Sequence, residues 1–179
     1  MQFSSTTLSD ALLVTLEPAH DDRGFFARSF NVEELACRGL ETNFPQHSIS
    51  YSERVGTLRG MHYQLDPASE VKLVRCTRGL VHDVIADIRP QSPTYGKWQA
   101  FTLSAENHSQ LYIPKGFAHG FQTLSDDVEM NYLISEPYQP ELARGFRYDD
   151  STFAIDWPLS VTAISRKDLE WPRFSDGHP

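Results

Sequence analysis

Short apolar segments recur along the chain, and residues that form turns separate them. The segments are rich in β-branched and aromatic residues, a pattern typical of β-strands. They are ALLVTL (11–16), KLVRC (72–76), LVHDVIADI (80–88), WQAFTL (98–103), QLYIP (110–114) and EMNYLI (129–134). Turn formers between them are Arg78-Gly79, Pro90 to Pro93, Ala105 to Asn107 and Pro114 to Gly116. Regularly spaced strands with almost no helix between them predict an antiparallel sandwich or barrel.

One segment has the pattern of a short helix instead. Asn31 is a suitable N-cap, Glu34 lies where a capping-box partner belongs, and Gly39 is suited to end the helix. The tail from Trp157 onward is polar and carries three prolines. We expect this tail to wrap around the barrel without joining a sheet.

The segment LRGMHYQL, residues 58–65, carries more polar groups than a strand that only packs a core would need. Side chains alternate between the two faces of a strand, so His62 and Gln64 share one face. A small barrel has room inside for one ligand, and the pattern predicts that His62 and Lys72 both point there. Alternatively, Lys72 is a solvent-facing lysine of an edge strand. Asp83 could pair with Lys72 inside the barrel, in a structural or a functional role.

The composition of the chain limits the kinds of binding partner and the cellular compartment that are expected. The 179 residues suit one domain with a sizeable core. The net charge of −8 argues against binding to nucleic acid or to an anionic membrane surface. Two cysteines without framework spacing favour a reducing, cytoplasmic environment. The N-terminal segment has no basic start and only a short apolar run, so neither a signal peptide nor a membrane span is predicted.

The segment YIPKGFAHGF, residues 112–121, resembles the second motif of the cupin superfamily, in which a Pro-x-Gly-x-x-His turn delivers a histidine, here His119, into the barrel. In metal-binding cupins the first motif contains His-x-His and then a glutamate. This chain reads His62-Tyr63-Gln64 instead, and the next acid is Glu70. Zinc and iron sites usually need three or four His, Cys or carboxylate ligands, so no catalytic metal is expected. The two histidines are then available for proton transfer.

Seven blocks of sequence extend this resemblance over nearly the whole chain. They are DDRGFF (21–26), TLRGMHYQ (57–64), KLVRCTRG (72–79), DVIADIRPQSPTYGKW (83–98), LYIPKGFAHGF (111–121), NYLISEPY (131–138) and ISRKD (164–168). In this order and spacing they resemble the dTDP-4-dehydrorhamnose 3,5-epimerase family, metal-free cupins of nucleotide-sugar metabolism. The resemblance implies one domain over residues 1–179, with an all-β, cupin-type jelly-roll barrel and a few short helices.

The resemblance also implies an isomerase that converts dTDP-4-dehydro-6-deoxy-D-glucose to dTDP-4-dehydro-L-rhamnose. The hydrogens at C3 and C5 flank the C4 ketone, so removal of either proton gives an enolate. His62 matches the family's general base, and Asp168 matches the carboxylate that orients it. Lys72 matches the cation near the C4 oxygen, where negative charge develops. Tyr132 matches the acid that returns a proton from the opposite face.

Further residues match substrate-binding positions of the family. They are Arg23, Gln46, Ser48, Arg59, His119, Tyr138 and Lys167. Arg23 and Arg59 match phosphate contacts, for which a planar guanidinium is well suited. The resemblance implies no cofactor, and it implies a homodimer that exchanges N-terminal strands, so that residues 23–28 approach the partner's pocket. The segment RGFFARSF is indeed too apolar to be fully exposed.

Structural interpretations exist for several of these residues. His62 could be a core histidine with satisfied hydrogen bonds, and Tyr132 could be plain core. Asp168 could be the first-turn partner of Ser165 in a capping box. Arg23 could be a surface turn residue beside Gly24.

Three positions depart from the family's pattern and leave the function partly open. Arg28 follows RGFF-Ala where a glutamate is common, Ala143 stands where a glutamate is frequent, and Gln46-His47-Ser48 replaces a Q-x-N motif. All three bear on substrate contacts. The alternatives are an epimerase acting at C3 only, a keto-isomerase, an enzyme that uses another nucleotide carrier, or a non-catalytic sugar-binding cupin. A non-catalytic protein would be expected to have lost part of the acid–base set.

Overall fold

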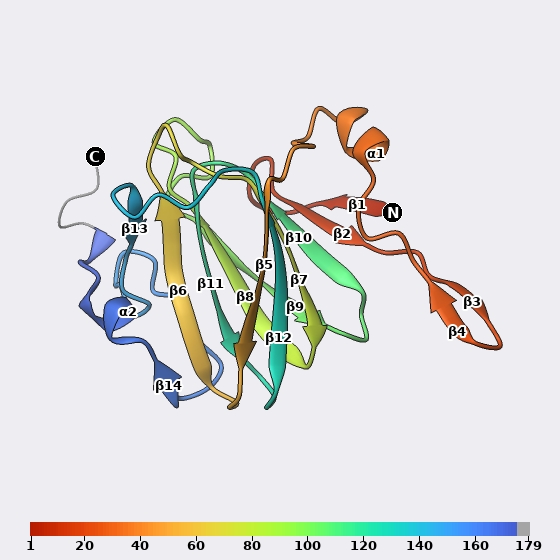
Figure 1. Ribbon diagram of the computed structural model, residues 1–179. Coiled ribbons are helices and arrows are strands. Elements are labelled where there is room, and N and C mark those ends of the chain that lie inside the picture. Colours follow the sequence, from red (N-terminus) through yellow and green to blue (C-terminus); the bar gives the residue numbers. More distant parts are fainter. Residues whose placement is uncertain (175–179) are drawn as a thin grey trace.

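A computed structural model describes residues 1–174 and shows two β-sheets packed face to face (Figure 1). Within this range one sheet has the order β1-β2-β10-β7-β12-β5, with β1 (Gln2–Ser5), β2 (Leu12–Thr15), β10 (Ser109–Ile113), β7 (Lys72–Arg78), β12 (Val128–Ile134) and β5 (Gln46–Ser52). The other has the order β13-β6-β11-β8-β9, with β13 (Ala143–Gly145), β6 (Thr57–Gln64), β11 (Phe117–Thr123), β8 (Leu80–Asp87) and β9 (Trp98–Ser104). Each of the six predicted apolar segments forms a strand, and the predicted antiparallel sandwich is confirmed.

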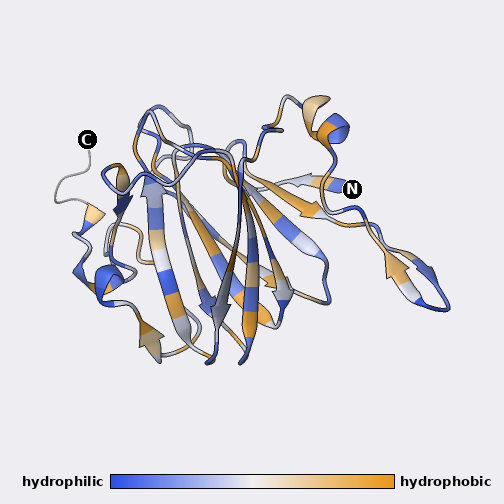
Figure 2. Cartoon of the chain, viewed as in Figure 1, coloured by the Kyte–Doolittle hydropathy of each residue, from blue (hydrophilic) through white to orange (hydrophobic). Residues whose placement is uncertain are grey.

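The central strands are covered on both faces, so every residue of β10 and β11 is buried although both strands mix polar and apolar residues (Figure 2). Val74 of β7 and Ile85 of β8 lie in the core between the sheets. Leu73 of β7 faces the opposite way and packs against Leu35 outside the first sheet. Val84 of β8 packs under the C-terminal segment outside the second sheet. The period of two therefore separates three apolar layers.

Two short helices lie outside the sheets in the described part of the chain. The first, α1 (Val32–Ala36), begins at the predicted N-cap, where the Asn31 Oδ1 accepts hydrogen bonds from the backbone N–H groups of Glu33 and Glu34, at 3.0 and 3.3 Å. It ends at Ala36, before the expected Gly39, which adopts a left-handed conformation with φ +69°. The second helix, α2 (Arg166–Glu170), begins at Ser165.

The C-terminal tail does join a sheet, contrary to the prediction. Residues Ala163–Ile164 form β14, which pairs in parallel with Thr57 and Leu58 of β6. A strand of two residues is too short to show an alternating pattern. Its pairing covers part of the edge of β6, which would otherwise present free backbone groups to solvent.

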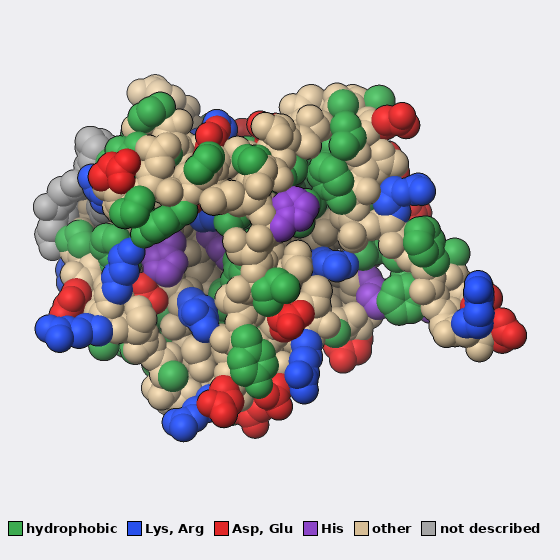
Figure 3. Space-filling view, viewed as in Figure 1, with side chains coloured by type: hydrophobic (Ala, Val, Ile, Leu, Met, Phe, Trp, Pro, Cys, Tyr) green, Lys and Arg blue, Asp and Glu red, His purple; other side chains and the backbone are tan. Residues whose placement is uncertain are grey.

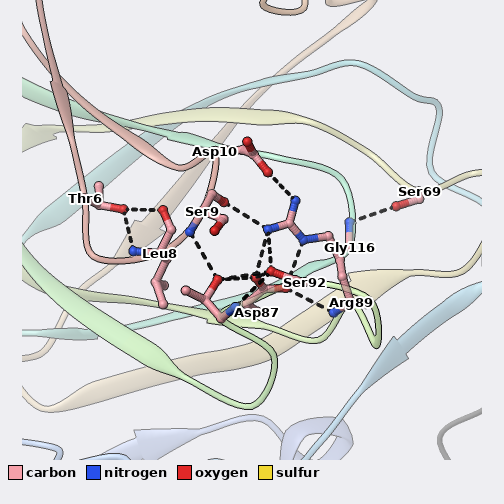
Figure 4. Close-up of polar contacts among 10 residues, drawn as sticks. Thr6, Leu8, Ser9, Asp10, Ser69, Asp87, Arg89, Ser92 and Gly116 are labelled. Atoms are coloured by element: carbon pink, nitrogen blue, oxygen red, sulfur yellow. Dashed lines mark hydrogen bonds and ion pairs between the residues drawn. The ribbon is translucent and has the colours of Figure 1, made fainter.

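A buried polar cluster ties the N-terminal loop to the connection between β8 and β9 (Figure 4). Asp87 is fully buried, and its carboxylate accepts hydrogen bonds from Arg89, Ser92 and Thr94. The same guanidinium of Arg89 also pairs with Asp10 at 2.8 Å. Segments distant in sequence are thus fixed together by charge-assisted hydrogen bonds.

A small hairpin projects from the body of the sandwich (Figure 1). It consists of β3 (Ala19–Asp21) and β4 (Gly24–Phe26). Phe25 and Phe26 near its end are 53% and 72% exposed.

No helix in residues 1–174 is long and apolar enough to cross a membrane.

Candidate active site

A cavity of about 640 Å³ opens between the two sheets. This volume falls within the range of small-ligand pockets. Figure 3 shows the hollow on this face of the molecule, with histidine side chains inside it and Lys or Arg side chains near its edge. The cavity brings together all the predicted site residues except Arg23.

Two glycines allow the histidine-bearing strands to approach closely. Gly60 lies two residues before His62 on β6, and Gly120 follows His119 on β11. A Cβ atom at Gly60 would lie only 2.6 Å from the Cα of Gly120. The absence of side chains at these positions lets His62 and His119 pair in register across neighbouring strands.

His62 and Asp168 form the closest acid–base contact in the cavity. The His62 Nε2 lies 2.5 Å from the Asp168 Oδ1, and the histidine side chain is 44% exposed whereas that of Asp168 is 5% exposed. Burial by itself would raise the pKa of Asp168, but hydrogen bonds, chiefly with His62, hold it below its usual value. An ionised Asp168 keeps the hydrogen on Nε2, so Nδ1 is the ring nitrogen available to accept a proton.

The capping interpretation of Asp168 accounts for its backbone only. Its N–H donates to the Ser165 Oγ at 3.0 Å, as an N-cap requires. The carboxylate is directed at His62 and at the backbone N–H of Gly60. The helix cap therefore holds the backbone in place while the side chain remains free to orient His62.

Tyr132 enters the cavity from the opposite sheet. Its hydroxyl forms a 3.0 Å hydrogen bond with the Oγ of Ser50 on the neighbouring strand β5. Burial raises the pKa of this phenol well above its usual range. Tyr132 is therefore protonated at neutral pH and can act as a donor.

The expected pairing of Asp83 with Lys72 is wrong. Asp83 is fully buried on β8 and lies 2.9 and 3.0 Å from the Nε2 of His119 on the adjacent strand. The Nζ of Lys72 instead lies 2.8 Å from the Oε1 of Glu70, two residues before it. Neighbouring strands of one sheet bring Asp83 to His119, whereas Lys72 belongs to the other sheet. Lys72 is not a solvent-facing lysine, since only 13% of its side chain is exposed.

Basic and amide side chains lie around the rest of the cavity. The Arg59 guanidinium donates to the Ser52 Oγ at 3.1 Å and to the Tyr51 carbonyl at 2.7 Å. The Lys167 Nζ lies 3.4 Å from the hydroxyl of Tyr138. The Gln46 Oε1 accepts a hydrogen bond from the Tyr138 N–H, and Ser48 lies nearby on the same strand β5.

Arg23 lies outside the cavity of this chain, whereas Gln64 lines it with its amide already hydrogen-bonded. Arg23 lies on the projecting hairpin, where its Nη2 is 2.5 Å from the Oδ2 of Asp21. The side-chain amide of Gln64 donates to the carbonyls of Ala68 and Pro137 and accepts a hydrogen bond from the N–H of Gln139. Among residues 1–174 no group of three or more His, Cys, Asp or Glu side chains could hold a metal ion.

Among the cavity residues that the sequence did not predict, Ser50, Glu70 and Trp171 contact predicted site residues directly. Ser50 bonds to Tyr132, Glu70 pairs with Lys72, and the Trp171 ring packs edge-on against His62 with ring centroids 6.4 Å apart. Ser50 shares a strand face with Ser48, so strand alternation could have indicated it. Trp171 lies in a tail without periodicity, and no pattern pointed to it.

Together these groups are suited to proton transfer next to a carbonyl. An oriented histidine on one sheet faces a protonated phenol on the other, so a bound carbon can be approached from two sides. Lys72 supplies a cation in a largely enclosed wall, where a developing oxyanion would be stabilised.

Comparison with known proteins agrees with this chemistry. A sequence model of the family described as dTDP-4-dehydrorhamnose 3,5-epimerase matches residues 5–176. The dTDP-4-dehydrorhamnose 3,5-epimerase of Shigella flexneri is 44% identical over 179 residues, covering 98% of this chain and 97% of that protein.

Solved structures show the same fold. The dTDP-4-dehydrorhamnose 3,5-epimerase of Bacillus anthracis, with TDP and PPi bound, has a TM-score of 0.93 and 40% identity over 96% of this chain and 98% of that one. The dTDP-6-deoxy-D-glucose-3,5-epimerase of Legionella pneumophila, in complex with dTDP-4-keto-L-rhamnose, has a TM-score of 0.90 and 38% identity over 96% and 92%. The predicted cupin-type jelly roll is thereby confirmed.

Proposed function

Because the chain belongs to the dTDP-4-dehydrorhamnose 3,5-epimerase family, we propose that His62, Lys72 and Tyr132 carry out its reaction in the cavity between the sheets. The protein is an isomerase, with dTDP-4-dehydrorhamnose 3,5-epimerase activity in dTDP-rhamnose biosynthesis. The observation that carries the assignment of roles is that His62, paired with Asp168, and Tyr132 lie on opposite sheets.

In the proposed mechanism His62 removes the proton from C3 or C5 of the 4-keto sugar. The electron pair moves toward the C4 oxygen, and the Lys72 ammonium stabilises the resulting enolate. Asp168 stabilises the imidazolium that forms and keeps the ring in one orientation. Tyr132 then donates its proton to the carbon from the other side, which inverts the centre. Its hydroxyl regains a proton from solvent by way of Ser50, the adjacent hydroxyl at 3.0 Å, and the His62 imidazolium releases its proton to solvent.

The substrate is proposed to be a dTDP-linked 4-keto-6-deoxy sugar, held by its diphosphate. TDP is bound in the Bacillus anthracis structure and dTDP-4-keto-L-rhamnose in the Legionella pneumophila structure. Arg59 in the cavity supports diphosphate binding, because a guanidinium can make paired hydrogen bonds to phosphate oxygens. Gln46, Ser48, His119, Tyr138 and Lys167 are proposed as further contacts.

We further propose that residues 1–179 act as one domain, in the cytoplasm, as a homodimer. The dimer is supported by the projecting hairpin, whose phenylalanines are exposed in the single chain. A partner that packs against this hairpin would cover them and could receive Arg23 in its own cavity.

The direct test follows deuterium incorporation at C3 and C5 of dTDP-4-keto-6-deoxyglucose by NMR in D₂O. We expect exchange and inversion at both carbons. Exchange at C3 alone would indicate a C3 epimerase, and binding without any exchange would indicate a non-catalytic sugar-binding cupin.

A further inference from the structure

Trp171 lines the cavity beside His62, and the proposed mechanism gives it no role. Its ring centroid lies 6.4 Å from that of His62, with the two ring planes at 65°. Aromatic rings at such a distance and angle attract each other. The Nζ of Lys167 lies 5.2 Å from the indole ring, within the range of a cation–π contact. One side chain thus contacts two residues to which the proposed function assigns a role.

The helix α2 and the residue after it direct three side chains into the same cavity. Trp171 follows the helix directly, three residues after Asp168 and four after Lys167. Residues with these spacings lie on one side of a helical turn, and all three line the cavity. Arg166 and Glu170 form an exposed ion pair at 2.6 Å and do not line it.

The strand next to His62 leaves room for the indole ring. Gly145 of β13 pairs in register with His62 of β6. A Cβ atom at Gly145 would lie only 2.6 Å from the Cε2 and Nε1 atoms of Trp171. Any side chain at this position would therefore displace the ring that contacts His62.

The hydrogen bond to Asp168 does not by itself fix the imidazole of His62. It holds Nε2, but a hydrogen bond tolerates a range of angles, so the ring plane can still tilt. The side chain is 44% exposed, which leaves space for such a tilt. Tilting would move Nδ1, the atom that accepts the proton in the proposed mechanism, and a misplacement of about 1 Å can cost about 10²-fold in rate. Trp171 contacts the imidazole at a second place and limits the tilt.

We propose that Trp171 is a positioning residue for the base of the reaction, an inference that rests on the proposed function. Its ring holds the imidazole plane of His62 so that Nδ1 points at the carbons flanking the ketone. Trp171 acts through His62, and its loss therefore lowers kcat. If Trp171 instead served as a contact for the sugar or the nucleotide, its loss would mainly raise KM.

Steady-state kinetics of deuterium exchange at C5 of dTDP-4-keto-6-deoxyglucose separate the two roles. Trp171→Leu keeps an apolar side chain but removes the ring, and should lower kcat by about tenfold to a hundredfold. KM should change by less than about threefold, because Lys167 keeps its contact with the Tyr138 hydroxyl at 3.4 Å. Trp171→Phe retains an aromatic ring and should restore kcat to within about threefold of wild type. It also removes an indole N–H that is buried without a hydrogen-bond partner within residues 1–174, so we expect it to fold.

Trp157→Leu is the matched control. Trp157 packs against another histidine, His82, with ring centroids 6.1 Å apart and planes at 68°, and neither residue lines the cavity. This variant also loses the hydrogen bond from the indole to the Tyr148 carbonyl. We expect a lower melting temperature, with kcat and KM unchanged at a temperature at which the variant is folded.

NMR of the wild-type protein gives a second test that needs no variant. The His62 ring protons should give one set of signals, with nuclear Overhauser effects to the Trp171 ring. The inference is overturned if these effects are absent, if Trp171→Leu keeps the wild-type kcat or raises KM alone, or if Trp171→Phe is as slow as Trp171→Leu. Absence of all exchange in the wild-type protein would instead contradict the proposed function.

Discussion

At the scale of single residues, the cavity keeps Asp168 ionised and Tyr132 protonated, as their proposed roles require. Asp168 is kept ionised: burial raises its pKa, but the contacts with His62, Ser165 and the backbone of Gly60 together lower it by more. Tyr132 is kept protonated, since burial raises its pKa by more than the bond from Ser50 lowers it. Groups whose environments separate their protonation states in this way are typical of acid–base pairs in active sites.

Replacing the proposed acid should uncouple proton exchange from inversion. Tyr132→Phe keeps the ring and its packing but removes the hydroxyl. We expect some solvent exchange to persist, because His62 can return a proton to the same face, while inversion falls by roughly 10²–10⁴-fold. NMR in D₂O measures both quantities. His62→Ala is the companion variant and should abolish both; exchange persisting in it would remove His62 from the role of base.

Activity should not depend on a divalent metal. Gln64 stands where metal-binding cupins have a second histidine, and its amide is already bonded to backbone groups. We therefore expect unchanged kcat/KM after treatment with a chelator and gel filtration, measured by the same exchange assay. Loss of activity that is restored only by added metal would contradict the mechanism.

At the scale of elements, short segments hold the site in place by anchoring longer strands. Ser165 caps α2 and so fixes the backbone of Asp168 against β6. The Asp87 cluster anchors the end of β8, whose central residue Asp83 holds His119. Loss of the Ser165 cap or of the Asp87 cluster would displace the elements that carry the cavity side chains.

The Asp87 cluster should contribute strongly to stability. Asp87→Asn removes the buried charge opposite Arg89, and we expect the free energy of unfolding to fall by about 3–5 kcal/mol at pH 7. Asp149→Asn breaks a partly exposed pair with Arg147 and should cost about 0–1 kcal/mol. Urea unfolding measures both differences.

The same variant should show a defined pH dependence. Burial would raise the pKa of Asp87, but its hydrogen bonds with Arg89, Ser92 and Thr94 lower it below its ordinary 3.8. A lowered folded-state pKa means that the stabilisation is present above pH 3.8 and is lost as the pH falls through the folded value. The difference between wild type and Asp87→Asn should therefore shrink in acid; a difference independent of pH would exclude the charge as its cause.

At the scale of the whole molecule, the two large sheets pack against each other, whereas the hairpin of β3 and β4 projects from them. The strands β3 and β4 pair only with each other in the described chain, and they carry Arg23 away from the cavity. Arg23 is the one predicted site residue outside the cavity, so its proposed phosphate contact would require a second subunit.

We expect a homodimer whose formation depends on the hairpin. Light scattering at micromolar concentration should give twice the 20.4 kDa of one chain. Phe26→Asp places a charge on a side chain that is 72% exposed, and should shift the population toward monomer and raise KM. Tyr95→Ser alters another exposed aromatic residue and should leave the mass unchanged. A monomeric wild-type protein would contradict the proposal.

Much of this molecule follows from the sequence because its signals are local. Alternation within LVHDVIADI or KLVRC requires only neighbouring residues, and the cap at Asn31 lies within one turn of its helix. The motifs around His62 and His119 could likewise be recognised from consecutive residues. Local signals of this kind predicted the antiparallel fold, and the resemblance to a known family, carried by seven such blocks, implied ten residues that line one cavity.

The tertiary structure alone decided how distant segments meet. Strand order placed Asp83 beside His119 and away from Lys72, and it brought Ser50 to the hydroxyl of Tyr132. The pairing of β14 with β6 joins residues about a hundred positions apart through only two residues. Such contacts depend on register and on sheet packing, which arise from the summed burial of many side chains. No single stretch of sequence carries that information.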